Sequence, residues 1–380
     1  MSPRPFLLLA ALALGCGDDT STTHAPAADA TPWDGATCPA GATRVADDPL
    51  DPHAVWCERD GRRHGPFLRT DAAGVRVDTG WYHDDHKHGR WTGWHDDAQP
   101  REAGDYAADL REGEWRHWRP DGSLEHTATW RADALDGPVT WYAPDGTLDA
   151  EQHWRDGRPD GTWRWYHADG SPRAERSYAD GEANGPARAW HPDGRLASEG
   201  SYRDGLPHGR WTTWHATGER QSEGDYAHGL RTGEWQAWNP DGTPDSRGPY
   251  VRDLPHGRWS FWDHDIREGT VTHTVRLDGE IIDGLGQGRW QSTWEADALP
   301  FEDFQLVDGA RHGPYASWHR TGEPAAEGQY VDDHRHGHWR YWHDNGQLEC
   351  EGDLWYGAEI WGSWQCYDRD GNPVEPGAER

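Results

Sequence analysis

The sequence predicts an all-β fold, an elongated, twisted strip or solenoid of about thirteen antiparallel β-hairpins with a 24-residue period. Two observations predict it. Glycines recur at that period, with aromatic residues two and five positions later in most repeats, and a fixed period of this length defines the unit of a repeat architecture. Two turn signals then divide each repeat into short strands, which leaves no room for a helix of ordinary length. The anchor glycines are Gly65, Gly89, Gly113, Gly137, Gly161, Gly185, Gly209, Gly233, Gly257, Gly288, Gly313, Gly337 and Gly362.

The two turn signals make each repeat a hairpin. In W-R-P-D-G (Trp118 to Gly122), Pro suits the second position of a type I turn and Gly the left-handed position that follows. In Y-R-D-G (Tyr202 to Gly205), the chain returns to the next anchor. We therefore expect the strand around Trp115 to pair with residues 125–129. Because the two aromatic positions are three residues apart, we expect either rings on both faces of the sheet or a bulge in the strand.

Aromatic rings must supply most of the apolar burial. The chain has 27 Trp, 5 Phe and 1 Met, and hydrophobic residues make up only 34% of it. We expect the rings to pack on one another as the core of the repeats, with each anchor glycine allowing a positive φ or the close approach of a ring to the backbone. The alternative is a row of rings exposed on one face, which would stack on the sugars of a glycan. The rings expected to pack are Trp91, Trp94, Trp115, Trp118, Trp163, Tyr166, Trp211, Trp214, Trp235, Trp238, Trp259, Trp262, Trp339 and Trp342.

The N-terminus has the features of a lipoprotein export signal. Residues 1–16 combine a short positive region, an apolar run and the sequence A-L-G-C, which resembles a bacterial lipobox. We expect Cys16 to be lipid-modified, the alternative being a plain secretory signal with a chance cysteine. Gly17 after it favours the outer membrane. Residues 17–36 are expected to be a disordered tether, since they hold almost nothing to bury. The predicted chain is thus exported and touches the membrane through its lipid anchor only.

Four further cysteines lie near the ends of the repeat array. Three pairings are formally possible, but an exported chain with two cysteines near each end favours two local disulfides. These would staple terminal repeats, which lack a neighbour on one side. The four cysteines are Cys38, Cys57, Cys350 and Cys366. The predicted parts are the signal (1–16), the tether (17–36), an N-terminal cap (37–60), the hairpin repeats (61–372) and a tail (373–380).

No residue pattern predicts catalysis, a metal site or a cofactor. There is no G-x-S-x-G elbow and no phosphate-binding glycine loop between a strand and a helix. Histidine and aspartate cluster from His83 to His88 and from Asp332 to His338, a composition able to bind a divalent metal ion. Both runs lie at return turns, however, where polar residues are expected anyway. The net charge of −30 repels nucleic-acid phosphates and anionic lipids. We predict a monomer that is not an enzyme and binds no metal, cofactor or nucleic acid.

The pattern H-G-x-W-x-x-W-x-x-[D/N]-G…G-x-Y-x-x-G resembles the bacterial MORN repeat variant family over about residues 58–372. The resemblance implies a strip of hairpin repeats that serves as a scaffold or a binding surface and is not itself an enzyme. Some bacterial members are labelled antitoxins. The export signal of this chain departs from a cytosolic antitoxin.

The predicted function is therefore that of a lipid-anchored, non-enzymatic protein of the cell envelope, which offers a surface for protein–protein contact or scaffolding. The alternatives are a glycan- or peptidoglycan-binding module that uses the aromatic rows, and an antitoxin or immunity-like binder. A local site is expected where the pattern breaks: at Val139 and Ala187, at the stapled ends, and at the step from Gly257 to Gly288, which holds seven extra residues. Insertions in repeat arrays often project from one face, while the alternative is a decayed repeat with a longer hairpin.

Overall fold

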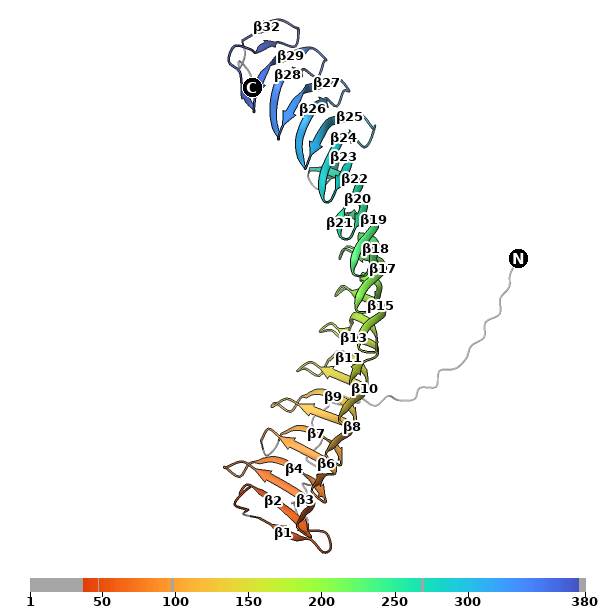
Figure 1. The fold of residues 1–380 in the computed structure, drawn as a ribbon, viewed down its shortest axis with the longest axis vertical. Coiled ribbons are helices and arrows are strands. Elements are labelled where there is room, and N and C mark those ends of the chain that lie inside the picture. The colour runs from red at the N-terminus through yellow and green to blue at the C-terminus, as the bar shows by residue number, and fades with distance from the viewer. Residues whose placement is uncertain (1–36, 47, 97–98, 268–269, 376–380) are drawn as a thin grey trace, which may run out of the picture. The chain divides into compact units, whose positions relative to one another are not determined.

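In the computed structural model the chain is built of β-strands (Figure 1). The structure describes residues 37–46, 48–96, 99–267 and 270–375, which contain thirty-two strands and no helix. None of the described residues accordingly forms a helix able to cross a membrane. The predicted signal, Cys16, the tether and residues 376–380 lie outside the described residues. The all-β fold class is confirmed.

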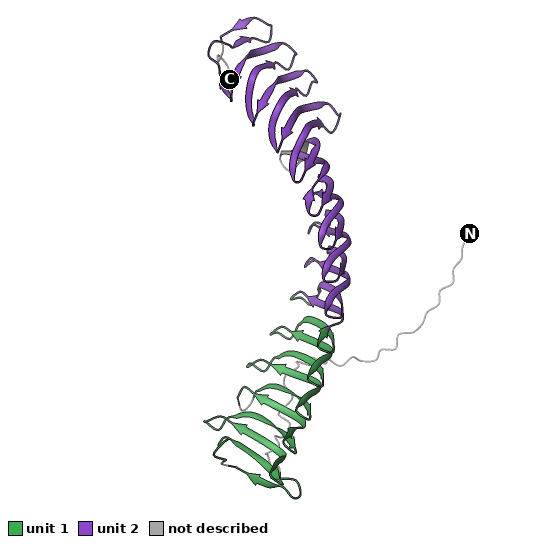
Figure 2. Ribbon diagram, in the orientation of Figure 1, with its two compact units in different colours: residues 1–158, 168–170 green, residues 159–167, 171–380 purple. Residues whose placement is uncertain are grey.

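The chain divides into two compact units (Figure 2): unit 1 is Met1–Arg158 with Ala168–Gly170, and unit 2 is Pro159–His167 with Ser171–Arg380. The strands of unit 1 are β1 (Thr43–Val45), β2 (Ala54–Arg59), β3 (Arg62–Thr70), β4 (Arg76–His83), β5 (His86–Lys87), β6 (Gly89–Trp94), β7 (Pro100–Ala107), β8 (Leu110–Trp118), β9 (Leu124–Arg131), β10 (Ala134–Tyr142) and β11 (Leu148–Arg155). The short β12 (Arg158–Pro159) contains the division between the units.

Unit 2 continues with the same alternation of strands and turns. Its strands are β13 (Gly161–Tyr166), β14 (Pro172–Ala179), β15 (Glu182–Trp190), β16 (Leu196–Arg203), β17 (Leu206–Trp214), β18 (Arg220–Ala227), β19 (Leu230–Trp238), β20 (Pro244–Val251), β21 (Leu254–Pro255), β22 (Gly257–Arg267), β23 (Thr270–Ile282), β24 (Leu285–Trp294), β25 (Pro300–Val307), β26 (Ala310–Trp318), β27 (Pro324–Val331), β28 (His334–Trp342), β29 (Leu348–Trp355), β30 (Ala358–Glu359), β31 (Gln365–Tyr367) and β32 (Pro373–Val374).

Within each unit, strands that follow one another in the chain pair antiparallel with a repeated register. In the hairpin of β17 and β18, Trp211 lies opposite Gly224, and the register shifts by one residue between Thr213 and Trp214. The corresponding shift recurs beside the second aromatic position of other hairpins, in both units. One strand thus carries an extra residue, which is a β-bulge that bends it.

The turns have the conformations that their residues favour. In the P-D-G turn, Gly122 has a φ of 85°, and the hairpin places Trp115 opposite Ala128. That pairing confirms the predicted one. In the return turn, Asp204 and Gly205 have φ values of 51° and 76°. Two successive positive φ values are those of a type I′ turn, whose twist matches that of the flanking strands.

The two aromatic positions of a hairpin send their rings to opposite faces of the sheet. Trp91 covers Gly80, whereas the Nε1–H of Trp94 donates to the hydroxyl of the adjacent Thr79 at 3.2 Å. Neighbouring residues of a strand point to opposite faces, so the two rings do as well. Of the two arrangements that the three-residue spacing allowed, the two-sided placement is the one present, because the extra residue of the bulge, Gln221 in the hairpin of β17 and β18, belongs to the partner strand.

The seven extra residues between Gly257 and Gly288 lengthen a single hairpin. The strands β22 and β23 pair from Gly257 opposite Ile281 to Arg267 opposite Thr270. The insertion therefore extends the strands themselves, which agrees with the longer-hairpin interpretation.

Candidate functional site

A tryptophan ring lies against a glycine in most of the hairpins. This contact determines which ring faces are accessible to a ligand. A Cβ added to Gly224 would lie 2.1 Å from the Cδ2 atom of Trp235. The indole Nε1–H of Trp235 then donates to the carbonyl of Asp225 at 3.2 Å. The ring is therefore held by both its face and its polar atom. The same contact joins Gly80 and Trp91, Gly104 and Trp115, Gly200 and Trp211, Gly248 and Trp259, Gly279 and Trp290, Gly328 and Trp339, and Gly352 and Trp364.

The glycine under the ring is not the anchor glycine. The sequence predicted that the anchor allows either a positive φ or the approach of a ring. The structure separates these roles: anchor Gly233 has a φ of 65° with nothing near its missing Cβ, while Gly224 of the preceding strand receives the ring. Because Gly224 has no side chain, the indole can lie directly on the backbone of its strand.

Tyrosines fill the spaces between these tryptophans. The ring of Tyr226 meets Trp235 edge-to-face, with centroids 5.1 Å apart, and Trp235 meets Tyr250 in the same way at 6.2 Å. The guanidinium of Arg231 lies 4.0 Å from the centre of the Tyr250 ring. Edge-to-face pairs and cation–π contacts each stabilise by about 0.5–1.5 kcal/mol. Burial raises the pKa of Tyr226 above its usual range and that of Tyr315 to about 12, so these phenols stay neutral.

The structure places all fourteen of the aromatic residues expected to pack in buried or half-buried positions. The buried ones are Trp91, Trp94, Trp115, Trp118, Trp235, Trp259 and Trp339, and the half-buried ones are Trp163, Tyr166, Trp211, Trp214, Trp238, Trp262 and Trp342. Since stacking on a sugar needs an accessible ring face, the packed rows offer little to a glycan.

At the two positions where the aromatic pattern breaks, the residue that replaces the tryptophan and the residue opposite it both differ from those of other hairpins. Val139 lies opposite Ala128, where other hairpins have the glycine, and Ala187 lies opposite Arg176. Both Val139 and Ala187 are buried. A residue with a side chain leaves no space for an indole, so a smaller partner replaces the tryptophan. The sequence contains part of this relation, because a glycine fifteen residues after one anchor is followed by a tryptophan two residues after the next anchor at several repeats, as in Gly224 and Trp235. Trp163 is an exception, since Gln152 stands at the corresponding position.

Beside the first break, two histidines replace the usual small residues. The rings of His117 and His126 stack with centroids 4.2 Å apart, and His126 also stacks on Trp141 at 4.2 Å. Burial lowers the pKa of His117, and burial together with the charge of His117 lowers that of His126 to about 4. Both imidazoles are therefore neutral near pH 7 and pack as aromatic residues.

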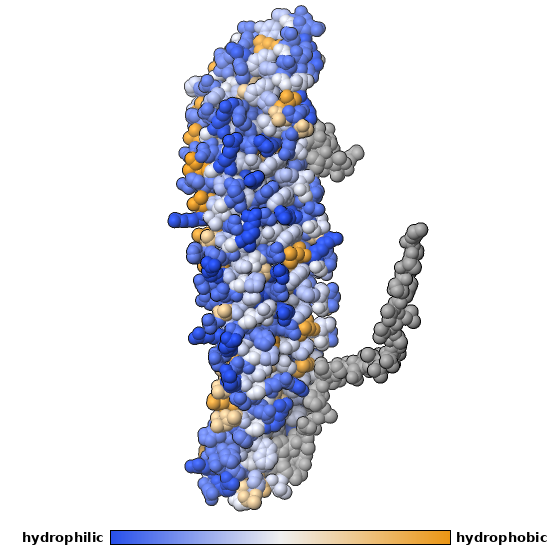
Figure 3. All heavy atoms as spheres, turned by 90° about the vertical axis from the view of Figure 1, so that its right-hand side faces the viewer, coloured by the Kyte–Doolittle hydropathy of each residue, from blue (hydrophilic) through white to orange (hydrophobic). Residues whose placement is uncertain are grey.

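The exposed apolar side chains of unit 2 gather at the return turns. We call seven of them the return-turn row: Leu206, Leu230, Val251, Leu254, Ile282, Leu285 and Val307, each 41–51% exposed. Two pairs of members lie opposite each other across their turns: Val251 opposite Leu254, and Ile282 opposite Leu285. Figure 3 shows how unusual such residues are, since apolar residues form small groups near the margins of a mainly hydrophilic face.

The C-terminal repeats expose a second apolar group, in the return turn after β29 and the loop that follows β30. Trp361 is 99% exposed and Trp355 is 61% exposed, with Tyr356 and Ile360 also exposed. The residues of neither group were predicted from the sequence. The sequence does contain a signal for the return-turn row, because a leucine stands three residues before the anchor glycine at Leu110, Leu206, Leu230, Leu254 and Leu285.

The remaining predicted residues lie as follows. Cys38 is bonded to Cys57, and Cys350 to Cys366. The run from Asp332 to His338 is dispersed: His336 packs on the ring of Trp355, whereas His338 pairs with Asp353 at 3.1 Å. In the run from His83 to His88, by contrast, His83 and Asp84 lie close to His64 of the preceding strand.

One comparison with known proteins identifies the repeat in part of the chain. The model of the MORN repeat variant matches residues 135–156, 159–180 and 335–355. No curated protein matches the chain. Among solved structures, the crystal structure of TcdB2-TccC3-TEV is 10% identical over 86% of this chain and 20% of its own, with a TM-score of 0.15. The Tc holotoxin pore of Photorhabdus luminescens is 12% identical over 84% of this chain and 19% of its own, with a TM-score of 0.15. The chain thus spans at most one fifth of those chains. The hairpin repeats at these three places match the MORN repeat variant.

Proposed function

We propose that this chain is a non-enzymatic binding protein of the cell envelope, whose return-turn row holds a protein partner. One observation carries the proposal: the rings that fill the repeats are covered by the protein itself, while an aliphatic row is left exposed along the return turns of unit 2. Exposed apolar residues grouped within a polar surface are typical of protein contact sites.

The chemistry of the row favours a protein over a glycan. Its members are leucine, valine and isoleucine, which bury against apolar side chains and offer sugar hydroxyls nothing to bond. Aspartates of the same turns, Asp204, Asp253, Asp283 and Asp308, outnumber the two arginines, Arg203 and Arg252. We therefore expect a partner with a matching apolar strip flanked by lysine or arginine, which the net charge of −30 would also attract.

The proposed location follows from the N-terminal segment. Cys16 in its lipobox-like sequence would carry the lipid, and the tether would hold the repeats away from the membrane. Replacing Cys16 by serine is expected to release the chain into the soluble fraction. A Cys16→Ser chain that stays membrane-bound with unchanged processing would contradict the anchor without touching the binding proposal.

Paired substitutions test the binding surface. We expect Leu230→Asp with Leu254→Asp to lose most of the protein that co-purifies with the wild-type chain from its native host. The matched control is Ala216→Asp with Gln221→Asp, which adds the same charge to exposed residues near the P-D-G-type turn of β17 and β18. Equal loss in both variants would assign the effect to charge. Retention on purified peptidoglycan by wild type and variants alike would favour the glycan-binding alternative instead.

A further inference from the structure

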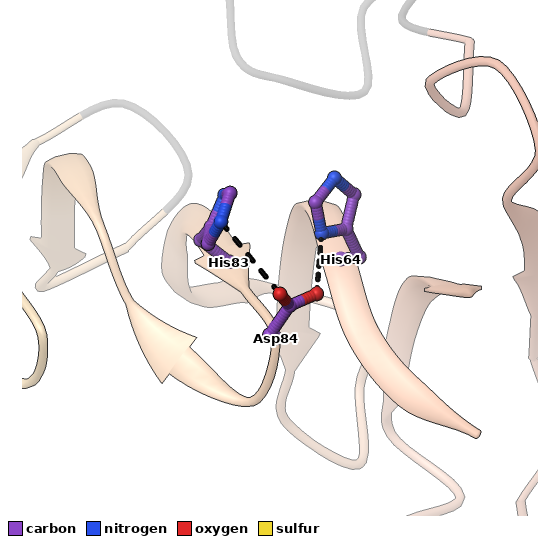
Figure 4. Close-up of side chains that lie close together, drawn as sticks. All are labelled: His64, His83 and Asp84. Carbon is purple, nitrogen blue, oxygen red and sulfur yellow. Dashed lines mark hydrogen bonds and ion pairs between the residues drawn. The ribbon is translucent and has the colours of Figure 1, made fainter. Parts of the chain in front are cut away.

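We propose that His64, His83 and Asp84 bind a divalent transition-metal ion of the zinc type at the N-terminal end of unit 1. Each residue offers one ligand atom, and the three atoms lie within 4.8 Å of one another. His64 comes from β3, His83 ends β4, and Asp84 begins the return turn that follows (Figure 4). Two imidazoles with one carboxylate are an established ligand set for zinc and for other divalent transition metals.

The distances are close to those that a metal ion requires. His64 Nδ1 lies 3.0 Å from Asp84 Oδ1, and His83 Nε2 lies 3.7 Å from Asp84 Oδ2. Ligand bonds of about 2.0–2.2 Å in a tetrahedral site separate ligand atoms by about 3.3 Å. Figure 4 shows both imidazoles directed at the same carboxylate. His83 is exposed, so its side chain is free to rotate towards the other two ligand atoms.

Capping of the return turn explains the pair of His64 and Asp84, but it does not explain His83. The pair of a histidine before the anchor and an aspartate in the return turn recurs as His312 with Asp332 at 3.3 Å. There, however, the residue before the aspartate is Val331, where this cluster has His83. The second imidazole is thus not needed to cap the turn.

The surroundings of the two imidazoles also suit a metal ion. His64 is buried, and His64 and His83 line a pocket of about 360 Å³ together with His88 and Pro39, while Asp84 lies outside the lining of that pocket. The ring of His88 lies 5.8 Å from that of His83, so a third imidazole faces the same space. Pro39 neighbours the cysteine bonded to Cys57, which places the cluster against the disulfide-linked end of the array. A bound ion would tie β3 to the return turn of β4 beside this staple.

Arg59 is the group that competes with the metal. One of its guanidinium nitrogens, Nη2, lies 3.0 Å from His64 Nδ1 and 3.4 Å from Asp84 Oδ1. This cation holds the carboxylate when no metal is bound. The Arg59 side chain is partly exposed, so it can swing outward into solvent when an ion replaces it. Removal of Arg59 should therefore strengthen binding, the opposite of what loss of a structural residue usually does.

Zinc titration of the full chain tests the proposal. All variants carry Cys16→Ser, because the other four of the five cysteines are in disulfides and no free thiol then remains. Isothermal titration with zinc chloride is expected to show one site that is at least 10-fold weaker in His83→Val and stronger in Arg59→Ala. The control His334→Val removes an exposed histidine elsewhere and should leave this site unchanged. X-ray absorption at the zinc edge should report two imidazoles and oxygen ligands.

A variant that gains a zinc site tests the proposal even if the His83→Val chain fails to fold correctly. Val331→His supplies the missing imidazole beside His312 and Asp332, and it should create a second zinc site. Unchanged zinc affinity in His83→Val, or a wild-type absorption spectrum without imidazole ligands, would overturn the proposal. The outcome is independent of the binding proposal, which concerns unit 2.

Discussion

At the scale of single residues, the fold depends on glycines that lie under tryptophans. Where a ring and a backbone touch directly, one methyl group decides whether the strand fits. A Cβ at Gly224 would lie 2.1 Å from the nearest Trp235 atom, closer than any stable contact. This arrangement replaces the aliphatic core that the composition lacks.

We expect Gly224→Ala to destabilise unit 2 by about 1–3 kcal/mol, because the added methyl overpacks a rigid ring. Thermal unfolding followed by tryptophan fluorescence measures the effect. The control is Gly93→Ala, whose new Cβ would first meet the flexible end of the Arg101 side chain. A Gly224→Ala chain as stable as the control would show that the ring can move aside.

The half-buried His126 makes the stability of unit 1 depend on pH. Its pKa is lowered from 6.5 to about 4 in the folded chain, so between these values the unfolded chain binds more protons than the folded one. Stability is therefore full above pH 6.5 and falls as the pH drops towards 4. We expect His126→Phe, which keeps a ring in the stack, to lose less stability on acidification over this range. Identical pH profiles in thermal melts would contradict the assignment.

At the scale of the hairpin, the sequence predicts a great deal. The period, the P-D-G turn and the pairing of Trp115 with residues 125–129 follow from local patterns, since turn chemistry and spacing are local properties. The glycine that receives each ring could not be assigned from one repeat, because the contact joins adjacent hairpins. His64 and His83 lie within one hairpin, and their nearness depends on the register between β3 and β4, which the sequence pattern did not specify residue by residue.

The packing of Val139 against Ala128 can be tested by restoring the tryptophan and the glycine that other hairpins have at these two positions. Val139→Trp alone should destabilise unit 1, because the methyl of Ala128 occupies the place of the indole. Combined with Ala128→Gly, the tryptophan should fit as it does in the other hairpins. A double-mutant cycle is expected to give a favourable coupling of about 0.5–3 kcal/mol. Additive effects would mean that the two positions do not form a unit.

At the scale of the whole molecule, the distribution of charge and apolar surface limits what the chain can bind. The net charge is −30, and most ion pairs are exposed, so each stabilises by about 0–1 kcal/mol. The sequence predicted a binding surface but placed it on the aromatic rows or at the breaks of the pattern. The rows are covered by their own glycines and tyrosines, and the return-turn row was missed because single leucines in a polar turn are inconspicuous in a sequence.

The most direct test of the central claim is photo-crosslinking in the native host, with a photoreactive residue placed at single positions of unit 2. Probes at Leu230 and Leu254 are expected to capture the same protein, which mass spectrometry identifies, while probes at Ala216 and Gln221 capture none. Capture of that protein only from the second pair of positions, or of no protein from the return-turn row, would contradict the account.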